Sequence, residues 1–512
     1  MTKLSINDVV TSFTHDHNAI FFQDHNGSSY CNLTKNNKKD SLEITSQQMR
    51  DTLRNFCRKK KIEVSKHKLE EIIYEFDSLA FESSNKQDVF IRAGVDKKTG
   101  YLYFDHCDDE GNITCVMPGK ISTQQDCPIS FIRPNKQCPI PIPLKEDYAL
   151  FLKKFERLWN LKNKNYSILI LVYILNALKK DSGSYAILIL EGGQGQGKST
   201  ASKYIKNLID PTQPPLSSPP RNMEQISVIA SSGYLVAIDN ISGINSELAD
   251  AFCRISTGGG VHFRVLYTNN REVVYNLQRP VLINGIDEPT NRADFLDRAI
   301  VLELQLIPYE MRESEMSLQE KFQTDLPYLI GGIYSLLADV LERLPKISHH
   351  NLPRMTDYAR IGIAVEQILG MEKGSFLKIY NQNIHEKSEN SFWNDEMCSL
   401  IYNKLDDDMY KRREGIRGSI MMIKKDLYQS ERGKFNSLAP KTIKGFASHL
   451  KRIEPVLKTR GIIVERLPRT ASARELMIRF DDETFNKYPK DNVSQSFLHS
   501  TIQDPGIDLD LI

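Results

Sequence analysis

The chain has 512 residues, of which 40% are hydrophobic and 26% are charged, values typical of a globular protein with substantial cores. This length predicts three or four domains at about 100–200 residues each, and the net charge of +2 neither identifies nor excludes a charged partner. No apolar run reaches the roughly 18 residues of a membrane span, and the N-terminus lacks the features of a signal peptide. We therefore expect a cytoplasmic protein with no membrane partner, whose scattered cysteines stay reduced.

The N-terminal 140 residues predict an α+β domain whose role the sequence does not indicate. An Asn-Gly turn at residues 26–27 indicates a hairpin, and the spacing over Thr45–Lys61 indicates a helix. Short alternating runs over Asp88–Met117 predict a meander of strands, and the proline-rich stretch Arg133–Leu144 predicts a linker. From Lys145 the pattern becomes helical.

The segment Ala186–Leu190 predicts a buried strand that runs directly into a glycine-rich stretch. Gly192–Ser199 fits the pattern GxxxxGK[ST], in which glycines let backbone amides point at phosphate oxygens. Lys198 supplies charge for the β and γ phosphates, Ser199 supplies a Mg²⁺ ligand, and the next helix directs its positive end at the anion. The sequence therefore predicts an ATP site; the alternative is a glycine-rich turn that matches by chance. The candidate nucleotide contacts are Gly192, Gly195, Gly197, Lys198, Ser199 and Thr200.

Two further buried runs are expected to bring polar side chains to this site. The run Gly233–Ser242 ends with Asp239, which is predicted to hold the water shell of Mg²⁺. Many P-loop ATPases have a glutamate at the next position, but here it is Asn240, whose amide orients water and cannot take its proton. The run Arg279–Asp287 contains Asn284, which is predicted to contact the γ phosphate and the attacking water. The alternative is an asparagine that only forms a turn.

Arg298 begins another apolar strand. In a ring, an arginine here is predicted to reach the ATP of the neighbouring subunit and stabilise charge developing on the γ phosphate. The alternative is a salt bridge to Asp294 or Asp297.

A hairpin is predicted within Thr257–Gln278, where two β-rich runs flank a polar tip. Because it precedes the strand of Asn284, it is placed to project into the central hole of a ring. His262, Arg264 and Arg271 are its candidate contacts to a nucleic-acid backbone. The alternative is an ordinary surface hairpin.

The C-terminal part is locally basic. Lys411–Arg479 contains 18 Lys and Arg against 6 Asp and Glu, whereas residues 480–512 carry 7 acids against 2 lysines. A helix beginning near Pro440, followed by strands at 461–467 and 475–480, predicts a winged helix-turn-helix domain. We expect it to bind DNA with an affinity that falls as salt rises; the alternative is a basic face packed against the ATPase or an acidic partner. The candidate DNA contacts are Lys441, Lys444, Lys451, Arg452, Arg469 and Arg474.

The order of these motifs resembles the AAA+ ATPases of phages and integrated mobile elements, which include primase–helicase-like proteins similar to superfamily 3 helicases. The resemblance covers residues 150 to 380, through the P-loop, "AIDN", "RPVLINGI", "DRAIVL" and "LPRMTDYARIGIAVE", and is fainter on both sides. It implies an enzyme that uses ATP and Mg²⁺, a ring often of six subunits, and a primase as a candidate partner. It implies Arg298 as the arginine finger, and Arg354 or Arg360 as a lid arginine on the same nucleotide. The implied nucleotide-site residues are Lys198, Ser199, Asp239 and Asn284.

The expected fold class is α/β, with a P-loop AAA+ core and helical lid between an α+β domain and a winged-helix domain. The predicted domains are 1–140 (α+β), 145–310 (ATPase core), 311–390 (helical lid), 395–480 (winged-helix-like) and 481–512 (acidic tail). We expect an ATP-dependent DNA helicase or translocase of a phage or mobile element, acting in replication as a ring on single-stranded or forked DNA. The alternative is a nucleotide-controlled DNA-binding switch or defence ATPase with little unwinding, which Asn240 favours. A small-molecule kinase is less favoured because it needs neither the hairpin nor the basic domain.

Overall fold

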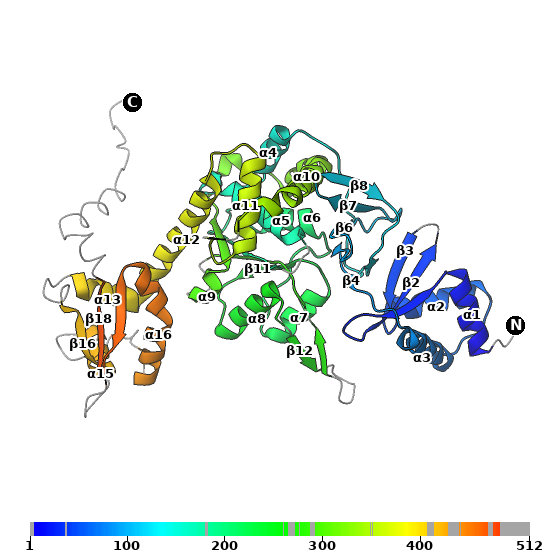
Figure 1. Cartoon of the computed structure of the whole chain (residues 1–512), viewed down its shortest axis with the longest axis horizontal. Coiled ribbons are helices and arrows are strands. Elements are labelled where there is room, and N and C mark those ends of the chain that lie inside the picture. The colour runs from blue at the N-terminus through cyan, green and yellow to red at the C-terminus, as the bar shows by residue number, and fades with distance from the viewer. Residues whose placement is uncertain are drawn as a thin grey trace. The chain divides into compact units, whose positions relative to one another are not determined.

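The computed structural model of the chain has two units: residues 1–290 and 294–383 form the first, and residues 291–293 and 384–512 form the second (Figure 1). Both units mix helices and strands. The described residues are 5–35, 38–179, 183–259, 261–264, 272–275, 277–286, 292–348, 350, 352–406, 414–428, 440, 442–468 and 475–481.

The first unit begins with a three-stranded antiparallel sheet packed against helices. The expected hairpin joins the first two strands, with Gly27 in the left-handed region at φ 84°, and this prediction is confirmed. The helix predicted over Thr45–Lys61 is confirmed as well; its cap is Ser46, whose hydroxyl accepts from the amide of Met49. The elements are α1 (Ile6–Asp16), β1 (Ile20–Gln23), β2 (Ser29–Lys35), β3 (Lys38–Glu43), α2 (Gln47–Lys59) and α3 (Lys66–Glu82).

The predicted meander is confirmed as a four-stranded antiparallel sheet in the order β5-β6-β7-β8, with β4 and β9 paired in parallel beside it. The proline-rich stretch Arg133–Leu144 that follows has neither helix nor strand, yet it is fixed along its length. The amide of Ile140 donates to the carbonyl of His106, and that of Leu144 donates to Pro327, at 2.9 and 3.0 Å. The strands are β4 (Val89–Phe90), β5 (Ala93–Val95), β6 (Leu102–Asp105), β7 (Ile113–Met117), β8 (Lys120–Gln124) and β9 (Ser130–Phe131).

The centre of the first unit is a parallel sheet in the order β11-β14-β10-β15. Helices α5 and α6 lie on one side of it and α7 and α8 on the other (Figure 1). Because both faces are covered, the apolar residues of the strands are buried, which explains their continuous apolar runs, while polar residues at the strand ends and at Asn240 keep some exposure. The elements are α4 (Tyr148–Glu156), α5 (Ser167–Leu178), β10 (Ile187–Glu191), α6 (Lys198–Ile209), α7 (Met223–Ser231), β11 (Val236–Ile241), α8 (Ser246–Thr257), β14 (Val281–Gly285), α9 (Ala293–Leu296) and β15 (Ala299–Glu303).

The predicted hairpin between α8 and β14 is confirmed by the antiparallel pair β12 (Val261–Arg264) and β13 (Glu272–Tyr275). After β15 the chain is helical, as expected. Gly331 in the long helix α10 allows the backbone of Leu144 to approach, because a Cβ at this position would overlap the carbonyl of Leu144. The elements are α10 (Glu315–Arg343), α11 (Thr356–Ile368) and α12 (Ser375–Asn394), with short 3₁₀ turns at Lys164–Tyr166, Tyr309–Met311 and Leu344–Lys346.

In its described residues, the second unit combines helices with an antiparallel sheet in the order β16-β18-β17. One face of helix α16 closes its core through Phe446, Leu450 and Leu457, which are at most 2% exposed. The elements are α13 (Glu396–Asp406), β16 (Ile416–Ser419), α15 (Ile420–Tyr428), α16 (Ile443–Thr459), β17 (Ile462–Arg466) and β18 (Glu475–Phe480). Across the described part of both units, no helix has the length and apolar character needed to cross a bilayer.

Candidate nucleotide-binding site

The P-loop is the connection between β10 and α6, at the carboxyl end of a central strand. Three of its glycines have positive φ angles: 153° at Gly192, 79° at Gly195 and 84° at Gly197. Residues with a side chain rarely adopt these angles, so glycine is required for the loop to curl. The curl leads into the first turn of α6, whose free amides and dipole favour an anion.

Lys198 lies across this curl. Its ammonium donates to the carbonyls of Gly192 and Gly193, at 2.5 and 2.7 Å. Burial lowers the pKa of Lys198, and the carboxylate of Asp239 partly opposes that shift. A flexible ammonium held by two neutral carbonyls is suited to exchange them for phosphate oxygens, which carry full charge.

Asp239 and Ser199 meet at the other side of the loop. The hydroxyl of Ser199 donates to a carboxylate oxygen of Asp239 at 2.8 Å, which joins the P-loop helix to strand β11. These two oxygen donors fit Mg²⁺, which is usually bound by one or two protein oxygens and completed by water and substrate phosphates. Among the described residues, no group of three or more His, Cys, Asp or Glu side chains forms a separate metal cluster.

Asn284 holds Asp239 in place from the neighbouring strand β14. Its amide nitrogen donates to Asp239 and to the hydroxyl of Ser202, both at 2.8 Å, and its oxygen accepts the backbone amide of Asn240 at 2.8 Å. The side chain is fully buried, and it lies in a strand rather than a turn. Sequence reasoning missed Ser202, although its position one turn after Ser199 on α6 places both hydroxyls on one helix face. Direct contact between Asn284 and a nucleotide remains a prediction.

Asn240 interrupts the regular pairing of β11. The register with β14 shifts between Ile238 and Ile241, and Asn240 adopts a left-handed φ of 56°. Asparagine tolerates this conformation better than most residues. The bulge leaves the Asn240 side chain exposed directly beside Asp239, where a group that acts on water is expected.

Arg298 lies at the opposite end of the sheet from its own P-loop. The next residue, Ala299, pairs with Ile187, whereas Glu303 pairs with Glu191 at the P-loop end. Four strand steps separate these pairs, or about 13 Å at the usual rise. The Nε atom of Arg298 is buried and has no hydrogen-bond partner in the described part of the chain.

The two candidate lid arginines each have other partners in the structure, and their contact with a nucleotide stays a prediction. Arg354 donates to Asp297 at 2.9 Å, at the same sheet end as Arg298, so Asp297 is already paired. Arg360 donates to the carbonyls of Leu344 and Ile347 and fixes α11 to the end of α10. Their positions depend on how α11 packs on α5, and motif order does not report that packing.

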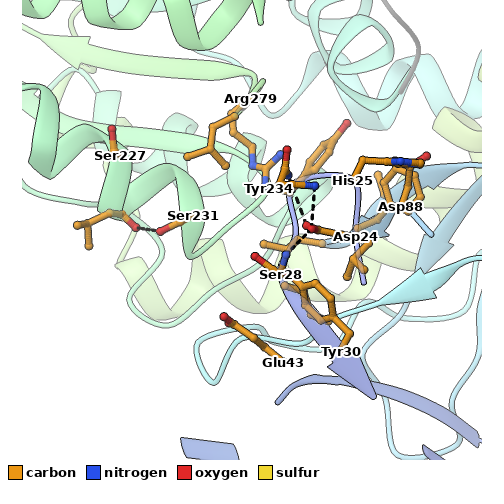
Figure 2. A pocket seen from close by; sticks show the side chains of 18 of the residues that line it. Asp24, His25, Ser28, Tyr30, Glu43, Asp88, Ser227, Ser231, Tyr234 and Arg279 are labelled. Atoms are coloured by element: carbon orange, nitrogen blue, oxygen red, sulfur yellow. Dashed lines mark hydrogen bonds and ion pairs between the residues drawn. The ribbon is translucent and has the colours of Figure 1, made fainter. Parts of the chain in front are cut away.

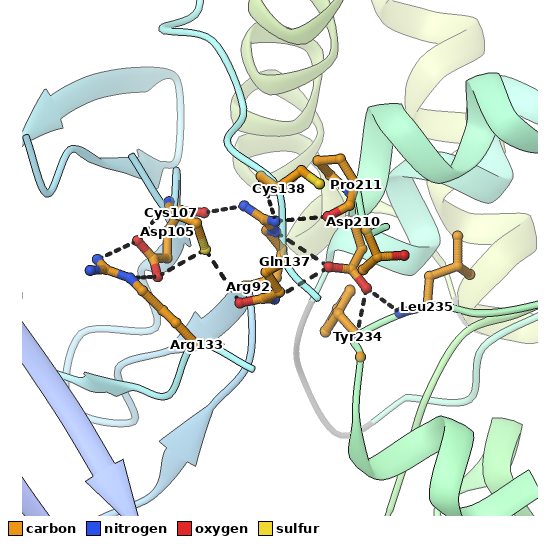
Figure 3. Close-up of polar contacts among 12 residues, drawn as sticks. Arg92, Asp105, Cys107, Arg133, Gln137, Cys138, Asp210, Pro211, Tyr234 and Leu235 are labelled. Atoms are coloured by element: carbon orange, nitrogen blue, oxygen red, sulfur yellow. Dashed lines mark hydrogen bonds and ion pairs between the residues drawn. The ribbon is translucent and has the colours of Figure 1, made fainter. Parts of the chain in front are cut away.

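A buried ionic network lies at the C-terminal end of the P-loop helix α6 (Figure 3). Asp210 ends α6 and accepts from the ammonium of Lys206 at 2.8 Å and from the amides of Tyr234 and Leu235 at 2.7 and 3.1 Å. Arg92 from the N-terminal region pairs with Asp210 at 3.3 Å. The network therefore connects that region to the end of the P-loop helix and to the start of the Asp239 strand.

A cavity of about 790 Å³ lies between the β1–β2 turn and α7 (Figure 2). Its lining includes the carboxylates of Asp24, Asp88 and Glu224, but none of the P-loop residues. Asp88 pairs with Lys97 at 2.6 Å, and Arg279 donates to the backbone carbonyls of α7 and its C-terminal turn. These polar groups stabilise the walls of the cavity.

The predicted DNA contacts are only partly described. Lys444, Lys451 and Arg452 are exposed on α16, and so is Lys458, which sequence reasoning missed although it continues the seven-residue spacing of Lys444 and Lys451. His262 and Arg264 lie on β12. The remaining candidates, Arg271, Lys441, Arg469 and Arg474, lie outside the described residues.

Part of the basic charge of the second unit is neutralised within it. Arg417 pairs with Glu475 at 3.0 Å, Arg479 pairs with Glu465 at 2.7 Å, and Arg466 pairs with Glu454. The exposed lysines of α16 form no ion pair with any residue in the described ranges of this unit. Helix α16 therefore presents an exposed row of positive charge that this unit's described residues do not neutralise.

Comparison with known proteins gives one family match. Residues 152–385, which include the P-loop, Asp239, Asn284 and Arg298, match the family model for the actinomycete integrative conjugative element replication protein. No curated protein matches the chain.

Among solved structures, the chain is similar to one described as "SCCmec type IV Cch - active helicase". The identity is 13%, with 90% of this chain and 93% of that chain covered and a TM-score of 0.45. It is also similar to the apo A form of the NrS-1 C-terminal region, at 13% identity, 94% and 100% coverage and a TM-score of 0.41.

Proposed function

We propose that this protein is an ATP-driven DNA translocase or helicase that acts in the replication of a mobile genetic element. The observation that carries the proposal is the contact of Ser199 with Asp239 at 2.8 Å, with Asn284 fixing the carboxylate from the next strand. This contact joins a phosphate-binding loop to an acid across three neighbouring strands. The family match over residues 152–385 supports a role in replication.

The residues of this chain divide the work on ATP between them. The amides of the curl and Lys198 bind the phosphate chain and neutralise its charge. Ser199 and Asp239 would hold Mg²⁺, which supplies charge stabilisation at the transferring phosphate when it is bound. Asn284 keeps Asp239 oriented, and the exposed amide of Asn240 orients the attacking water.

The proposed assembly is a ring, often of six subunits in similar proteins, in which Arg298 acts on the ATP of a neighbour. Its support is the position of Arg298 at the end of the sheet opposite its own P-loop, beyond pairs that are themselves about 13 Å apart along the strands. A residue at the opposite end of the sheet reaches a nucleotide when a second copy presents its P-loop there. Head-to-tail contacts of this kind close into a ring when the rotation between neighbouring subunits completes a full turn.

DNA is the proposed substrate along which the protein moves. The β12–β13 hairpin directly precedes β14, the strand of Asn284. A force that DNA exerts on the hairpin would therefore pass along the backbone to Asn284, which holds Asp239. In the second unit, the order of helices and strands is that of a winged helix, with α16 in the position of the recognition helix. Its exposed lysines are suited to phosphate contacts. A primase is a further candidate partner.

A second function is favoured by Asn240. Because an amide cannot take a proton from water, slow hydrolysis would make the protein a nucleotide-controlled DNA-binding switch or a defence ATPase. In that case ATP binding changes assembly on DNA, and little unwinding follows.

Strand displacement on a forked oligonucleotide tests the proposal. We expect the wild-type chain to hydrolyse ATP faster with single-stranded DNA and to release the labelled strand. Lys198→Ala should abolish both activities with an unchanged thermal melting profile. A wild-type protein that binds the fork and never releases a strand, at any ATP concentration, identifies the switch instead.

A further inference from the structure

Residues 304–312, which we call the strap, follow β15 and run along the outside of the P-loop. Leu304 donates its amide to the carbonyl of Glu191 at 2.8 Å, directly before the first P-loop glycine. Asn160 ties the strap to the loop, because its amide nitrogen donates to the carbonyls of Gln305 at 2.6 Å and Gln196 at 3.4 Å. The strap is therefore held against the loop by the backbone rather than only by side chains.

Two strap side chains face the curl of main chain itself. A Cβ placed on Gly197 would lie 3.5 Å from the Cδ1 atom of Ile307. A Cβ placed on Gly195 would lie 3.5 Å from the Nη2 atom of Arg312 and 4.0 Å from the centre of its guanidinium. Both distances are ordinary van der Waals contacts, so Arg312 lies directly beside the phosphate-binding glycines.

The Arg312 guanidinium is held in place but keeps hydrogen-bonding capacity. Its Nε donates to the carbonyl of Ile307 at 3.2 Å, which fixes the plane of the group. Tyr309 lies 6.0 Å away, at the outer limit of a cation–π contact. Such a preorganised fork loses little conformational entropy when it binds two oxygens of a phosphate.

The neighbouring acids do not neutralise it. Glu313 pairs with Lys321 at 2.5 Å, and Glu315 pairs with Lys203 of α6. Within the described parts of the chain, Arg312 forms no ion pair. The structure thus presents an exposed, oriented cation beside the P-loop, while Arg354 and Arg360 are occupied elsewhere.

We infer that Arg312 binds the phosphate chain of the nucleotide in the P-loop of its own subunit, taking the place that motif order predicted for Arg354 or Arg360. This inference rests on the proposed ATP site. It divides the two arginine roles by position: Arg312 acts on its own nucleotide, and Arg298 acts on that of a neighbour.

Equilibrium titration of the full chain with a fluorescent ATP analogue and the matching ADP analogue tests the inference. We expect Arg312→Ala to weaken ATP binding roughly 10-fold to 100-fold, as for the loss of a hydrogen-bonded charged partner. Arg312→Lys keeps the charge but loses the planar guanidinium, so its ATP affinity should lie between those of wild type and Arg312→Ala. Arg312→Gln provides a second uncharged variant of similar length. Arg343→Ala, which removes an exposed arginine at the end of α10, should bind like wild type.

The outcomes separate this inference from the proposed function. If wild type binds ATP and Lys198→Ala does not, while both uncharged Arg312 variants bind within twofold of wild type, the inference is overturned and the ATP site stands. If wild type binds neither nucleotide, both are overturned. Weakening for ATP alone supports a contact with the γ phosphate, and equal weakening for ATP and ADP supports a contact with the α or β phosphate.

Discussion

Arg92 and Asp210 form an ion pair at 3.3 Å in which neither side chain has any exposure to solvent. They are far apart in sequence, one at the start of the meander and the other at the end of the P-loop helix. Arg92 also donates to the carbonyls of Asp105 and Cys138, at 2.9 and 2.6 Å, so its charge is well satisfied. The pair makes the N-terminal region part of the structural support of the P-loop helix (Figure 3).

We predict that Arg92→Met lowers the stability of the first unit by about 3 kcal/mol or more, because it leaves a buried carboxylate with one cation fewer. The chain has two tryptophans, so Trp159 alone reports on this unit in a Trp393→Phe background. Urea unfolding followed by Trp159 fluorescence gives the change in midpoint. Lys162→Met, which removes an exposed cation from Glu303, is the control and should change stability by no more than about 0.5 kcal/mol. Equal midpoints for the two variants would contradict the prediction.

The same pair predicts how stability depends on pH. Burial raises the pKa of Asp210, but Lys206 and Arg92 outweigh it and hold the pKa well below its ordinary value. A carboxyl whose folded pKa is depressed adds stability above its unfolded pKa of about 3.9, and that stability is lost as pH falls toward the folded value. Asp105 acts in the same direction, because its pairing with Arg133 outweighs burial.

We therefore expect the urea midpoint of wild type to be nearly constant from pH 7 to about pH 5 and to fall steeply below pH 4. Asp210→Asn should be less stable at neutral pH and lose less of its remaining stability in acid. If the urea midpoints of wild type and Asp210→Asn fall equally as the pH drops below 4, Asp210 does not cause this pH dependence.

Asn240 provides a prediction about turnover. Asn240→Asp places a carboxylate of the same shape beside Asp239 and should raise the rate of hydrolysis roughly 10-fold or more if a missing base limits the reaction. Asn240→Gly is the matched control, since it keeps the φ of 56° and removes the amide, and it should slow hydrolysis. Single-turnover kinetics with saturating ATP measure both rates. A glycine variant as fast as wild type would mean that the Asn240 side chain does not act on water.

The part of the site that the sequence predicts is the part built from contiguous residues. A P-loop is one strand, one turn and one helix start, so its spacing alone indicates the curl, Lys198 and Ser199. Asp239 was also predictable, because a buried run that follows a P-loop and ends in an acid is typical of the strand that holds Mg²⁺. Both the P-loop and the strand that ends in an acid are local arrangements that recur in nucleotide-binding proteins, which is why the sequence indicates them.

The contacts that the sequence did not predict join segments with no local relation. Nothing in the spacing of Arg92 indicates Asp210, because their meeting depends on how the meander packs on α6. The family resemblance implied Arg354 or Arg360 at the nucleotide; the present partners of both depend on how α11 packs on α5, where Tyr358 donates to the carbonyl of Leu169 at 2.8 Å. In this structure the residues beside the P-loop are those of the strap, including Arg312.

Arg298 gives the prediction that tests the shared site. Arg298→Ala should bind ATP like wild type and hydrolyse it roughly 10³-fold more slowly, as for the loss of an arginine finger. Mixed with Lys198→Ala, it should regain activity, since an intact P-loop can then meet an intact Arg298 from the other variant. In a random equal mixture about a quarter of the head-to-tail interfaces combine the two intact parts. Titrating one variant into the other while following phosphate release measures the recovery.

A mixture of Lys198→Ala with Asp239→Asn is the matched control for this experiment. Both substitutions damage the P-loop side of the interface, so no combination of subunits restores a complete site and no recovery is expected. Recovery in the first mixture alone means that the two intact parts come from different copies of the chain. If neither mixture exceeds the sum of its separate activities, Arg298 acts within its own subunit or not at all. Its buried Nε, which finds no partner among the described residues, then contributes only to packing at the start of β15.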